Sequence, residues 1–227
     1  MVITIDGPAG SGKSTAARKL AARLGIPYLD TGAMYRAIAL AAVERGVDFL
    51  DKAALLAVAR AVRLELDCGP TYTRVRVDGR DVSEAIRTMA VSDVTPHVAM
   101  HEEIRKLLVE RQQAIGRTLG SFVSEGRDQG SVVFPGAEAK FVLEASLEKR
   151  AQRRLQEMLA DAEEVELDAV LGNLRARDAV DAKQWESLLQ PGRSIVIDTT
   201  DLTIAEVIDH LAAALDELTS KTATPKG

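Results

Sequence analysis

The residues best suited to chemistry stand in one run near the N-terminus, Gly7-Pro8-Ala9-Gly10-Ser11-Gly12-Lys13-Ser14. The run fits the pattern G-x-x-x-x-G-K-[ST], which indicates a P-loop when a strand precedes it and a helix follows it. Its glycines let successive backbone N–H groups point at phosphate oxygens, and the N-terminus of the next helix adds a positive field. In such a loop the lysine reaches the β- and γ-phosphates and the serine hydroxyl ligates Mg²⁺. We therefore expect Lys13 to meet the phosphates of a nucleotide and Ser14 to meet the metal.

Several other classes of P-loop protein lack support in the sequence. GTP-binding switches read guanine through an Asn-Lys-x-Asp segment, but the only asparagine of the chain, Asn173, is followed by Leu174. A Leu-Ser-Gly-Gly-Gln transporter signature is missing, and the chain is too short for a pair of helicase domains. The sequence therefore favours a small-molecule kinase, in which arginines on mobile flaps hold the second substrate.

Two further segments place an arginine where an acceptor phosphate could be held. Arg36 ends the segment at 29–36 and is predicted to lie inside a helix next to strand ends, where open α/β sheets bind ligands. Arg127 and Asp128 stand between glycines after a predicted strand, where an arginine suits phosphate and an aspartate suits a metal or a base amine. The alternatives are a helix N-cap beside a solvated arginine and a plain surface turn.

A group of arginines also marks a later helical stretch. Arg150, Arg153 and Arg154 fall at i, i+3 and i+4 and share one face of the predicted helix. Such a face is either a solvated charged surface or a lid that closes over transferring phosphates. A lid would offset negative charge and exclude water from the phosphoryl group.

These residues must be positioned by alternating strands and helices. Short apolar runs predict buried strands, at 2–5, 28–29, 122–123, 141–143 and 195–197. Apolar spacing predicts helices, at 13–24, 34–44, 102–115, 147–180 and 204–217, the last after a Thr203 N-cap. This alternation predicts a parallel sheet with crossover helices. We expect the tail at 220–227 to be frayed.

The middle of the chain breaks that alternation. Residues 63–67 and 73–77 alternate polar and apolar side chains, and Asp78-Gly79 is a hairpin signal. Alternation predicts strands with one wet face, hence an antiparallel patch. We therefore predict an insertion over residues 60–98.

The composition excludes other kinds of protein. Hydrophobic residues make up 46% and charged residues 28% of the 227 residues, as in an ordinary soluble globular protein. With only 4% aromatic residues and a net charge of −5, a surface for a nucleic-acid polymer is not expected. The single cysteine, Cys68, cannot form an internal disulfide, and no signal peptide or apolar run of about 18 residues is evident. We expect a cytoplasmic protein without a membrane span.

Taken together, these segments resemble the bacterial cytidylate kinase family. The most specific are Asp-Thr-Gly-Ala-Met-Tyr-Arg at 30–36 and Glu-Gly-Arg-Asp at 125–128; further matches are at 5–15, 86–88, 132–135, 177–181 and 197–200. The resemblance runs over residues 1–216 in the order of the family. It implies an α/β P-loop fold of the nucleoside monophosphate kinases. The core would comprise residues 1–59 and 99–227, with an antiparallel insertion at 60–98 that binds the monophosphate and a helical arginine lid at about 147–186.

The resemblance also implies the reaction and its residues. The γ-phosphoryl group of ATP would pass to CMP or dCMP, with Mg²⁺ as cofactor, in a monomeric enzyme. Residues expected to contact ATP are Gly7, Pro8, Ala9, Gly10, Ser11, Gly12, Lys13, Ser14 and Thr15, with Ser14 as the metal ligand. Residues expected to contact CMP are Arg36 and Arg127 at its phosphate, Thr31, Arg105 and Asp128 at cytosine, and Arg177 and Asp181 at the sugar. Catalytic roles are expected for Lys13, Arg127, Asp128, Arg153 and Arg154.

The chain departs from the usual family pattern near the acceptor site. Gln184 replaces an arginine, Gln129 replaces an aliphatic residue, and Pro96 stands where many members have a serine, with Thr95 beside it. Two other functions stay open. One is phosphorylation of another small acceptor, such as UMP, shikimate or dephospho-coenzyme A; the other is a nucleotide-binding adaptor without turnover. The arginines argue against an adaptor, which has no use for a second phosphate site.

Overall fold

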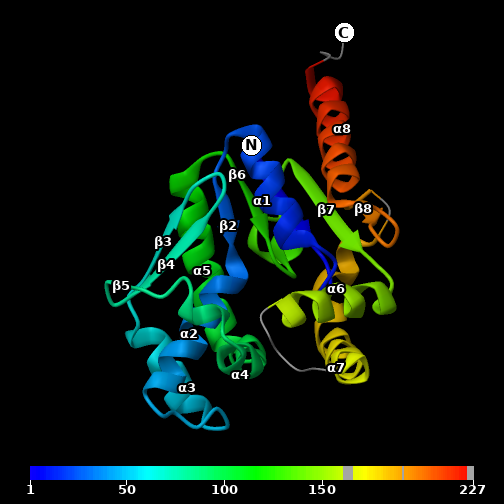
Figure 1. The fold of residues 1–227 in the computed structure, drawn as a ribbon. Helices are drawn as coiled ribbons and strands as arrows, with labels where there is room; N and C mark the ends of the chain where they lie inside the picture. Colours follow the sequence, from blue (N-terminus) through cyan, green and yellow to red (C-terminus); the bar gives the residue numbers. More distant parts are fainter. Residues whose placement is uncertain (161–165, 191, 224–227) are drawn as a thin grey trace.

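The computed structural model describes residues 1–160, 166–190 and 192–223, and its centre is a five-stranded sheet in the order β2-β6-β1-β7-β8 (Figure 1). All four neighbouring pairs of strands run parallel, as the alternation of elements predicts. The strands are β1 (Val2–Asp6), β2 (Tyr28–Asp30), β6 (Phe122–Glu125), β7 (Ala139–Glu144) and β8 (Ile195–Asp198).

The register of this sheet brings three acidic strand ends to one edge. Glu125 of β6 pairs with Asp30 of β2 on one side and with Ile5 of β1 on the other. Asp6, the last residue of β1, follows Ile5 directly. The carboxyl ends of parallel strands are where open α/β sheets bind ligands, so this edge positions the site.

The helices next to the sheet begin and end at recognisable caps. Helix α1 (Lys13–Leu24) follows the P-loop and ends at Gly25, as predicted. Helix α2 (Thr31–Glu44) begins three residues before the predicted start, because the Asp30 side chain accepts a hydrogen bond from the Ala33 amide and caps it.

Helix α8 (Ile204–Ala223) corrects the expectation of a frayed tail. It begins, as predicted, at Thr203, whose hydroxyl accepts from the Glu206 amide while the Glu206 carboxylate accepts from the Thr203 amide. The helix continues past residue 220 because Leu218 packs on the core shared with α1, and Thr219 donates back to the Leu215 carbonyl. The rest of the predicted tail, 224–227, lies outside the described residues.

The antiparallel sheet expected in the middle of the chain is confirmed. Strands β3 (Leu64–Cys68), β4 (Thr73–Val77) and β5 (Arg80–Asp81) pair antiparallel. Asp78 and Gly79, both with positive φ (52° and 84°), form the tight turn between β4 and β5.

Most of the helices around this sheet are not predicted from the sequence pattern. They are α3 (Lys52–Ala61), the short η1 (Ala85–Arg87), α4 (Met89–Ala99) and α5 (Glu102–Leu119), of which only α5 is expected. Val75 of β4 and Val91 of α4 pack in one hydrophobic cluster with Met34 and Ile38 of α2. The insertion therefore shares its core with α2, and its boundaries at 60–98 stay a prediction.

The charged stretch predicted at 147–180 is two helices, α6 (Leu147–Ala160) and α7 (Leu167–Trp185), followed by η3 (Glu186–Leu188). Between β6 and β7 the chain makes one π-helical turn, η2 (Gln129–Val133). In Figure 1 the elements α2 to α4 lie on the left of the parallel sheet, and α6 and α7 lie on the right. Among the described residues, no helix is both long and apolar enough to cross a membrane.

Candidate active site

The P-loop curls tightly over the carboxyl end of β1. Gly7 has φ of 142°, and a Cβ there would lie 2.2 Å from the Leu143 carbonyl oxygen of β7, so only glycine fits. Lys13 Nζ donates to the Pro8 carbonyl oxygen at 3.2 Å. Arg127 Nη1 donates to the Gly7 carbonyl oxygen at 2.5 Å. The segment after β6 is thus tied directly to the phosphate-binding loop.

A cavity of about 710 Å³ opens beside Lys13 and Ser14 and is lined from both sides of the sheet edge. Helices α2 and α4 supply one wall, and Asn173 and Ala176 of α7 belong to the other. The cavity collects these residues predicted for the site: Lys13, Ser14, Thr31, Arg36, Arg105, Arg127 and Asp128. The side chains of Arg177 and Asp181, and that of Gln184, lie outside the described part of the structure.

The insertion contributes to this cavity through its helices rather than its strands. Arg87 of η1, and Ser92, Thr95 and Pro96 of α4, line the cavity, whereas no residue of β3 to β5 does so in the described structure. The Thr95 hydroxyl donates to the Val91 carbonyl oxygen at 2.6 Å, so its proton is already used within the helix.

Two arginines at the cavity wall have fixed positions. Arg36 Nη1 donates to Ser92 Oγ at 2.7 Å and to the Ile86 carbonyl oxygen at 3.3 Å. Burial, followed by the charge of Arg87, lowers the pKa of Arg36. Arg87 Nη2 donates to Asp30 Oδ2 at 2.7 Å. The cavity therefore holds closely spaced positive charges, which suits a phosphate group.

Two buried carboxylates lie at or near the cavity: Glu125 lines it, whereas Asp6 does not. Glu125 Oε1 accepts from Ser14 Oγ at 3.0 Å, and burial, then the charge of Asp30, raises the pKa of Glu125. Asp6 is fully buried and accepts from the Gln129 and Gly130 amides, both at 2.8 Å. Burial raises the pKa of Asp6 to about 7, although these two amide hydrogen bonds oppose the rise.

Asp128 and Arg105 form an ion pair between Oδ2 and Nη2 at 2.5 Å, inside the same cavity. Burial raises the pKa of Asp128, while the charge of Arg105 opposes that rise. The Thr31 hydroxyl donates to the Glu125 carbonyl oxygen at 2.7 Å. A carboxylate, a guanidinium and a hydroxyl therefore meet at one end of the cavity.

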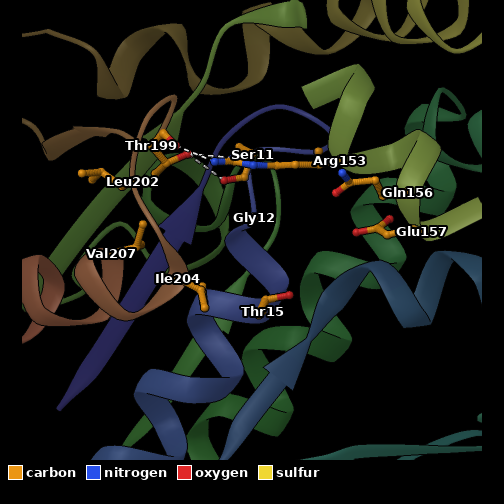
Figure 2. Close-up of a pocket in the computed structure, with 11 residues that line it drawn as sticks. Ser11, Gly12, Thr15, Arg153, Gln156, Glu157, Thr199, Leu202, Ile204 and Val207 are labelled. Carbon is orange, nitrogen blue, oxygen red and sulfur yellow. Dashed lines mark hydrogen bonds between the residues drawn. The ribbon is translucent and has the colours of Figure 1, made fainter. Parts of the chain in front are cut away.

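A smaller cavity, of about 430 Å³, lies on the other side of the P-loop (Figure 2). Four predicted loop residues line it, namely Gly10, Ser11, Gly12 and Thr15. Its polar wall comes from α6, with Gln156 and Glu157, and its apolar wall from the chain after β8, with Leu202, Ile204 and Val207.

The predicted arginine face of α6 is split among different contacts. Arg153 lines the smaller cavity and donates to Thr199 Oγ1 at 3.1 Å and to the Thr199 carbonyl oxygen at 2.5 Å (Figure 2). Arg154 lines neither cavity and pairs at 3.1 Å with Glu157, which lines the smaller one. The charge of Arg154 contributes to lowering the pKa of Arg36, after burial and the charge of Arg87. Arg150 is buried and forms an ion pair with Asp178 of α7 at 2.6 Å.

Some cavity residues carry no predicted role. Glu125 and Arg87 stand within motifs noted in the sequence, and a carboxylate at the end of a buried strand is a signal that could have found Glu125. Thr199 also stands within a noted segment, 197–200, but no local pattern predicts its contact with the P-loop, where its hydroxyl donates to the Ser11 carbonyl oxygen at 3.2 Å across 188 positions.

Comparison with known proteins decides the family. The family model described as "Cytidylate kinase" matches residues 3–217. This chain belongs to the cytidylate kinase family. A cytidylate kinase of Symbiobacterium thermophilum is 46% identical over 93% of this chain and 94% of its own length. A cytidylate kinase of Nocardia farcinica is 41% identical over 93% of this chain and 92% of its own length.

The fold of this cytidylate kinase family member also resembles more distant kinases. The crystal structure of a shikimate kinase from Bacteroides thetaiotaomicron superposes with a TM-score of 0.51 over 95% of this chain and 98% of that chain. The two sequences are 12% identical, so this likeness shows the shared α/β P-loop fold alone.

Proposed function

We propose that this chain transfers the γ-phosphoryl group of ATP to CMP or dCMP, which gives ADP and CDP or dCDP. The observation that carries the proposal is the pair of cavities that flank one P-loop. The smaller cavity is partly apolar and meets the loop at Gly10 to Gly12, which suits the donor nucleoside. The larger one holds Lys13 together with Arg36 and Arg127, which suits a second phosphate group.

The donor phosphates would lie along the P-loop, with Lys13 at the transferring group. The metal fits at Ser14, whose hydroxyl lies 3.0 Å from the buried Glu125 carboxylate, because Mg²⁺ prefers oxygen donors. The described residues contain no group of three or more His, Cys, Asp or Glu side chains placed to hold a metal, so phosphate and water would supply most ligands. When bound, Mg²⁺ would neutralise charge on the donor phosphates.

The acceptor would occupy the larger cavity. In the proposal Arg36 and Arg127 bind its phosphate, and Arg105, Asp128 and Thr31 face its base. Arg177 and Asp181 would bind the sugar; they follow Asn173 and Ala176 of α7 along the chain, both of which line the cavity.

The chemical step needs positioning more than covalent chemistry. An oxygen of the acceptor phosphate attacks the γ-phosphorus, the bond to the β–γ bridging oxygen breaks, and ADP leaves with that oxygen. Lys13 would hold the transferring group, while Arg153 and Arg154 on α6 would offset charge from the lid side. Asp128 would set the acceptor base in place.

The proposal also includes a monomer in the cytoplasm. Both cavities are lined by residues of a single chain, so a second copy is not needed to complete the site. The division into a core with an insertion at 60–98 belongs to the same proposal.

The test is turnover with a panel of acceptors. Purified protein, ATP and Mg²⁺ are offered CMP, dCMP, UMP, shikimate or dephospho-coenzyme A, and ADP release is followed. We expect the highest kcat/KM with CMP or dCMP. A higher value with another acceptor would assign a different kinase activity, and binding of ATP without turnover of any acceptor would indicate an adaptor.

A further inference from the structure

Gln129 stands directly after Asp128 and is almost wholly buried, with 1% of its surface exposed. Its side-chain amide contacts the Asp128 carboxylate from inside the protein, away from the cavity that Asp128 lines. We propose that Gln129 is a positioning residue that holds Asp128 in the orientation which selects cytosine over uracil. This inference rests on the proposed function and adds the residue that sets its base preference.

The Gln129 amide makes directional contacts on both ends. Its Oε1 accepts from Ser124 Oγ at 2.8 Å. Its Nε2 donates to Gln112 Oε1 at 3.3 Å and to Asp128 Oδ1 at 3.5 Å. The opposite orientation of the amide would set its oxygen, an acceptor, against the Asp128 carboxylate, which when ionised also only accepts. The N–H groups of Gln129 therefore face Asp128.

The packing around this amide leaves it little freedom. Ser124 and Gln112 are fully buried. A Cβ on Gly126 would lie 2.8 Å from Gln129 Nε2, so the backbone of that residue passes directly against the amide. The Gln129 main chain is held as well, since its N–H donates to Asp6 Oδ1 at 2.8 Å. A rigid amide can transmit its orientation to the carboxylate it contacts.

Each oxygen of Asp128 consequently has a different partner. Arg105 Nη2 holds Oδ2 at 2.5 Å, and Gln129 Nε2 lies at 3.5 Å from Oδ1. With both oxygens engaged, rotation of the carboxylate would lose a contact. Both partners are also donors, and donors favour the ionised carboxylate, which only accepts hydrogen bonds.

The ionisation and orientation of the Asp128 carboxyl group matter because cytosine and uracil differ in one exocyclic group. Cytosine presents an amino group there, whereas uracil presents an oxygen that accepts hydrogen bonds. A fixed, ionised carboxylate accepts from the amino group and repels the oxygen. A carboxyl group that takes up a proton can donate to uracil, and a carboxylate that rotates away no longer repels the uracil oxygen, so the preference for cytosine falls.

The charged and titratable groups around Asp128 come from four elements. Arg105 of α5 and Gln129 lower its pKa, which burial raises. Tyr35 of α2 lies near enough for the charge of Asp128 to help raise the tyrosine pKa to about 12, although burial is the main cause. Asp6 of β1 also feels this charge, and Glu125 of β6 acts on Asp6 in turn. Arg105 opposes the rise in the pKa of Asp128 most strongly, and the hydrogen bond from Gln129 opposes it to a smaller extent.

The test compares Gln129→Leu with a matched control, Gln113→Leu. Gln113 lies on α5 and donates to the Val133 carbonyl oxygen at 3.0 Å, so it binds the same turn but makes no hydrogen bond with Asp128 among the described residues. We expect Gln129→Leu to reduce the CMP-to-UMP ratio of kcat/KM about five- to tenfold, as for the loss of one ordinary hydrogen bond. The KM for ATP should stay unchanged, and Gln113→Leu should keep the wild-type ratio.

A second variant tests the same inference in case Gln129→Leu does not fold. Ser124→Ala removes only the donor that orients the Gln129 amide, and we expect it to reduce the same ratio about two- to threefold. An unchanged ratio in Ser124→Ala and in a folded Gln129→Leu would overturn the inference, and so would an equal loss in Gln113→Leu. If Gln129→Leu does not fold, Ser124→Ala decides alone.

Calorimetric binding of CMP and UMP to the same variants separates this inference from the proposed function. If the wild type binds CMP but does not phosphorylate it, the proposed function is contradicted. The ratio of CMP to UMP affinity in the variants then still tests the role of Gln129. If the wild type phosphorylates CMP but the Gln129 and Ser124 variants have the wild-type ratio of CMP to UMP affinity, the proposed function stands and the inference is overturned.

Discussion

Lys13 and Arg127 both donate hydrogen bonds to the phosphate-binding loop. Each donates to a loop carbonyl oxygen, that of Pro8 for Lys13 and that of Gly7 for Arg127. A phosphate oxygen is a stronger acceptor for a cation than a carbonyl oxygen. At the scale of single residues, the bound nucleotides would therefore replace contacts that the protein makes with itself.

Lys13→Ala should abolish turnover and leave the fold intact. The ammonium group stabilises charge on the transferring phosphoryl group, and by analogy with lost electrostatic donors its removal should raise the barrier by about 3–4 kcal/mol. Single-turnover rates with ATP and CMP measure the loss, and the melting temperature reports the fold. Near-normal activity in a folded variant would contradict the assignment of the P-loop.

Arg127→Ala should raise the KM for CMP much more than the KM for ATP. A charge-assisted contact with the acceptor phosphate is removed, which corresponds to about 1.5–3 kcal/mol, or roughly ten- to hundredfold. Initial rates over a grid of both substrates separate the two KM values. Equal increases would instead show that Arg127 serves the donor.

Asp128→Asn should lower kcat/KM for CMP and narrow its advantage over UMP. An amide can donate a hydrogen bond as well as accept one, so it no longer repels the uracil oxygen. The discrimination between cytosine and uracil, about 1–3 kcal/mol, should therefore shrink. The ratio of kcat/KM for the two acceptors measures the change. A ratio equal to that of the wild type would assign Asp128 to structure rather than base selection.

At the scale of elements, Arg150 joins three parts of the chain. It donates to the Ala9 carbonyl oxygen of the P-loop at 3.1 Å and pairs with Asp178 of α7. A Cβ on Gly10 would lie 3.0 Å from Arg150 Cβ, so α6 also packs directly on the loop. Helices α6 and α7 are therefore both attached to the phosphate-binding loop through one buried guanidinium.

Arg150→Met should destabilise the protein and weaken ATP binding together. Asp178 loses its partner and the Ala9 carbonyl oxygen loses a donor, which together should cost about 2–4 kcal/mol. Urea unfolding and the KM for ATP measure the two effects. Arg175→Met is the control, because Arg175 lies exposed on α7. If both variants behave alike, Arg150 does not couple α6 to the loop.

At the scale of the whole molecule, the parallel sheet concentrates acidic groups at one edge. Asp6, Glu125 and Asp128 lie there, and burial raises the pKa of each. A carboxyl group whose pKa is higher in the folded state stabilises the fold below its unfolded pKa, and this stabilisation is lost as the pH rises through the folded pKa. The ligand-free protein should accordingly lose stability between about pH 4 and pH 7.

Asp6→Asn should remove part of that pH dependence. The pKa of Asp6 is raised from 3.8 to about 7, so the wild type should lose up to about 1.4 kcal/mol per pH unit relative to the variant across this window, and nothing further above it. Urea unfolding of both proteins from pH 5 to pH 8 gives the difference. Parallel curves would show that Asp6 does not titrate there.

The sequence by itself determined the parts of this protein that depend on neighbouring residues. The P-loop, the Gly25 helix end, the Asp78-Gly79 turn and the Thr203 cap are each set by a few consecutive side chains, and the structure confirms them. Short apolar runs were sufficient to predict all five parallel strands, although β8, at the edge of the sheet, corrects the expectation that each is buried, since its residues are half-buried or exposed. Helix α4 was missed because it lies inside the stretch at 60–98, which was interpreted only as antiparallel strands, and α3 was missed because no element was assigned to the segment that follows the helix at 34–44.

Only the tertiary structure decided which distant residues meet. Arg87 reaches Asp30 across 57 positions, and Asp6 caps the amides of the turn at Gln129 across 123 positions. The arginines of α6 share one face in sequence, yet Arg153 binds Thr199 and Arg150 binds Asp178. A local pattern specifies an element and the face it buries, but such pairings depend on how the elements pack, because a buried charge adopts whichever partner the completed fold brings within reach.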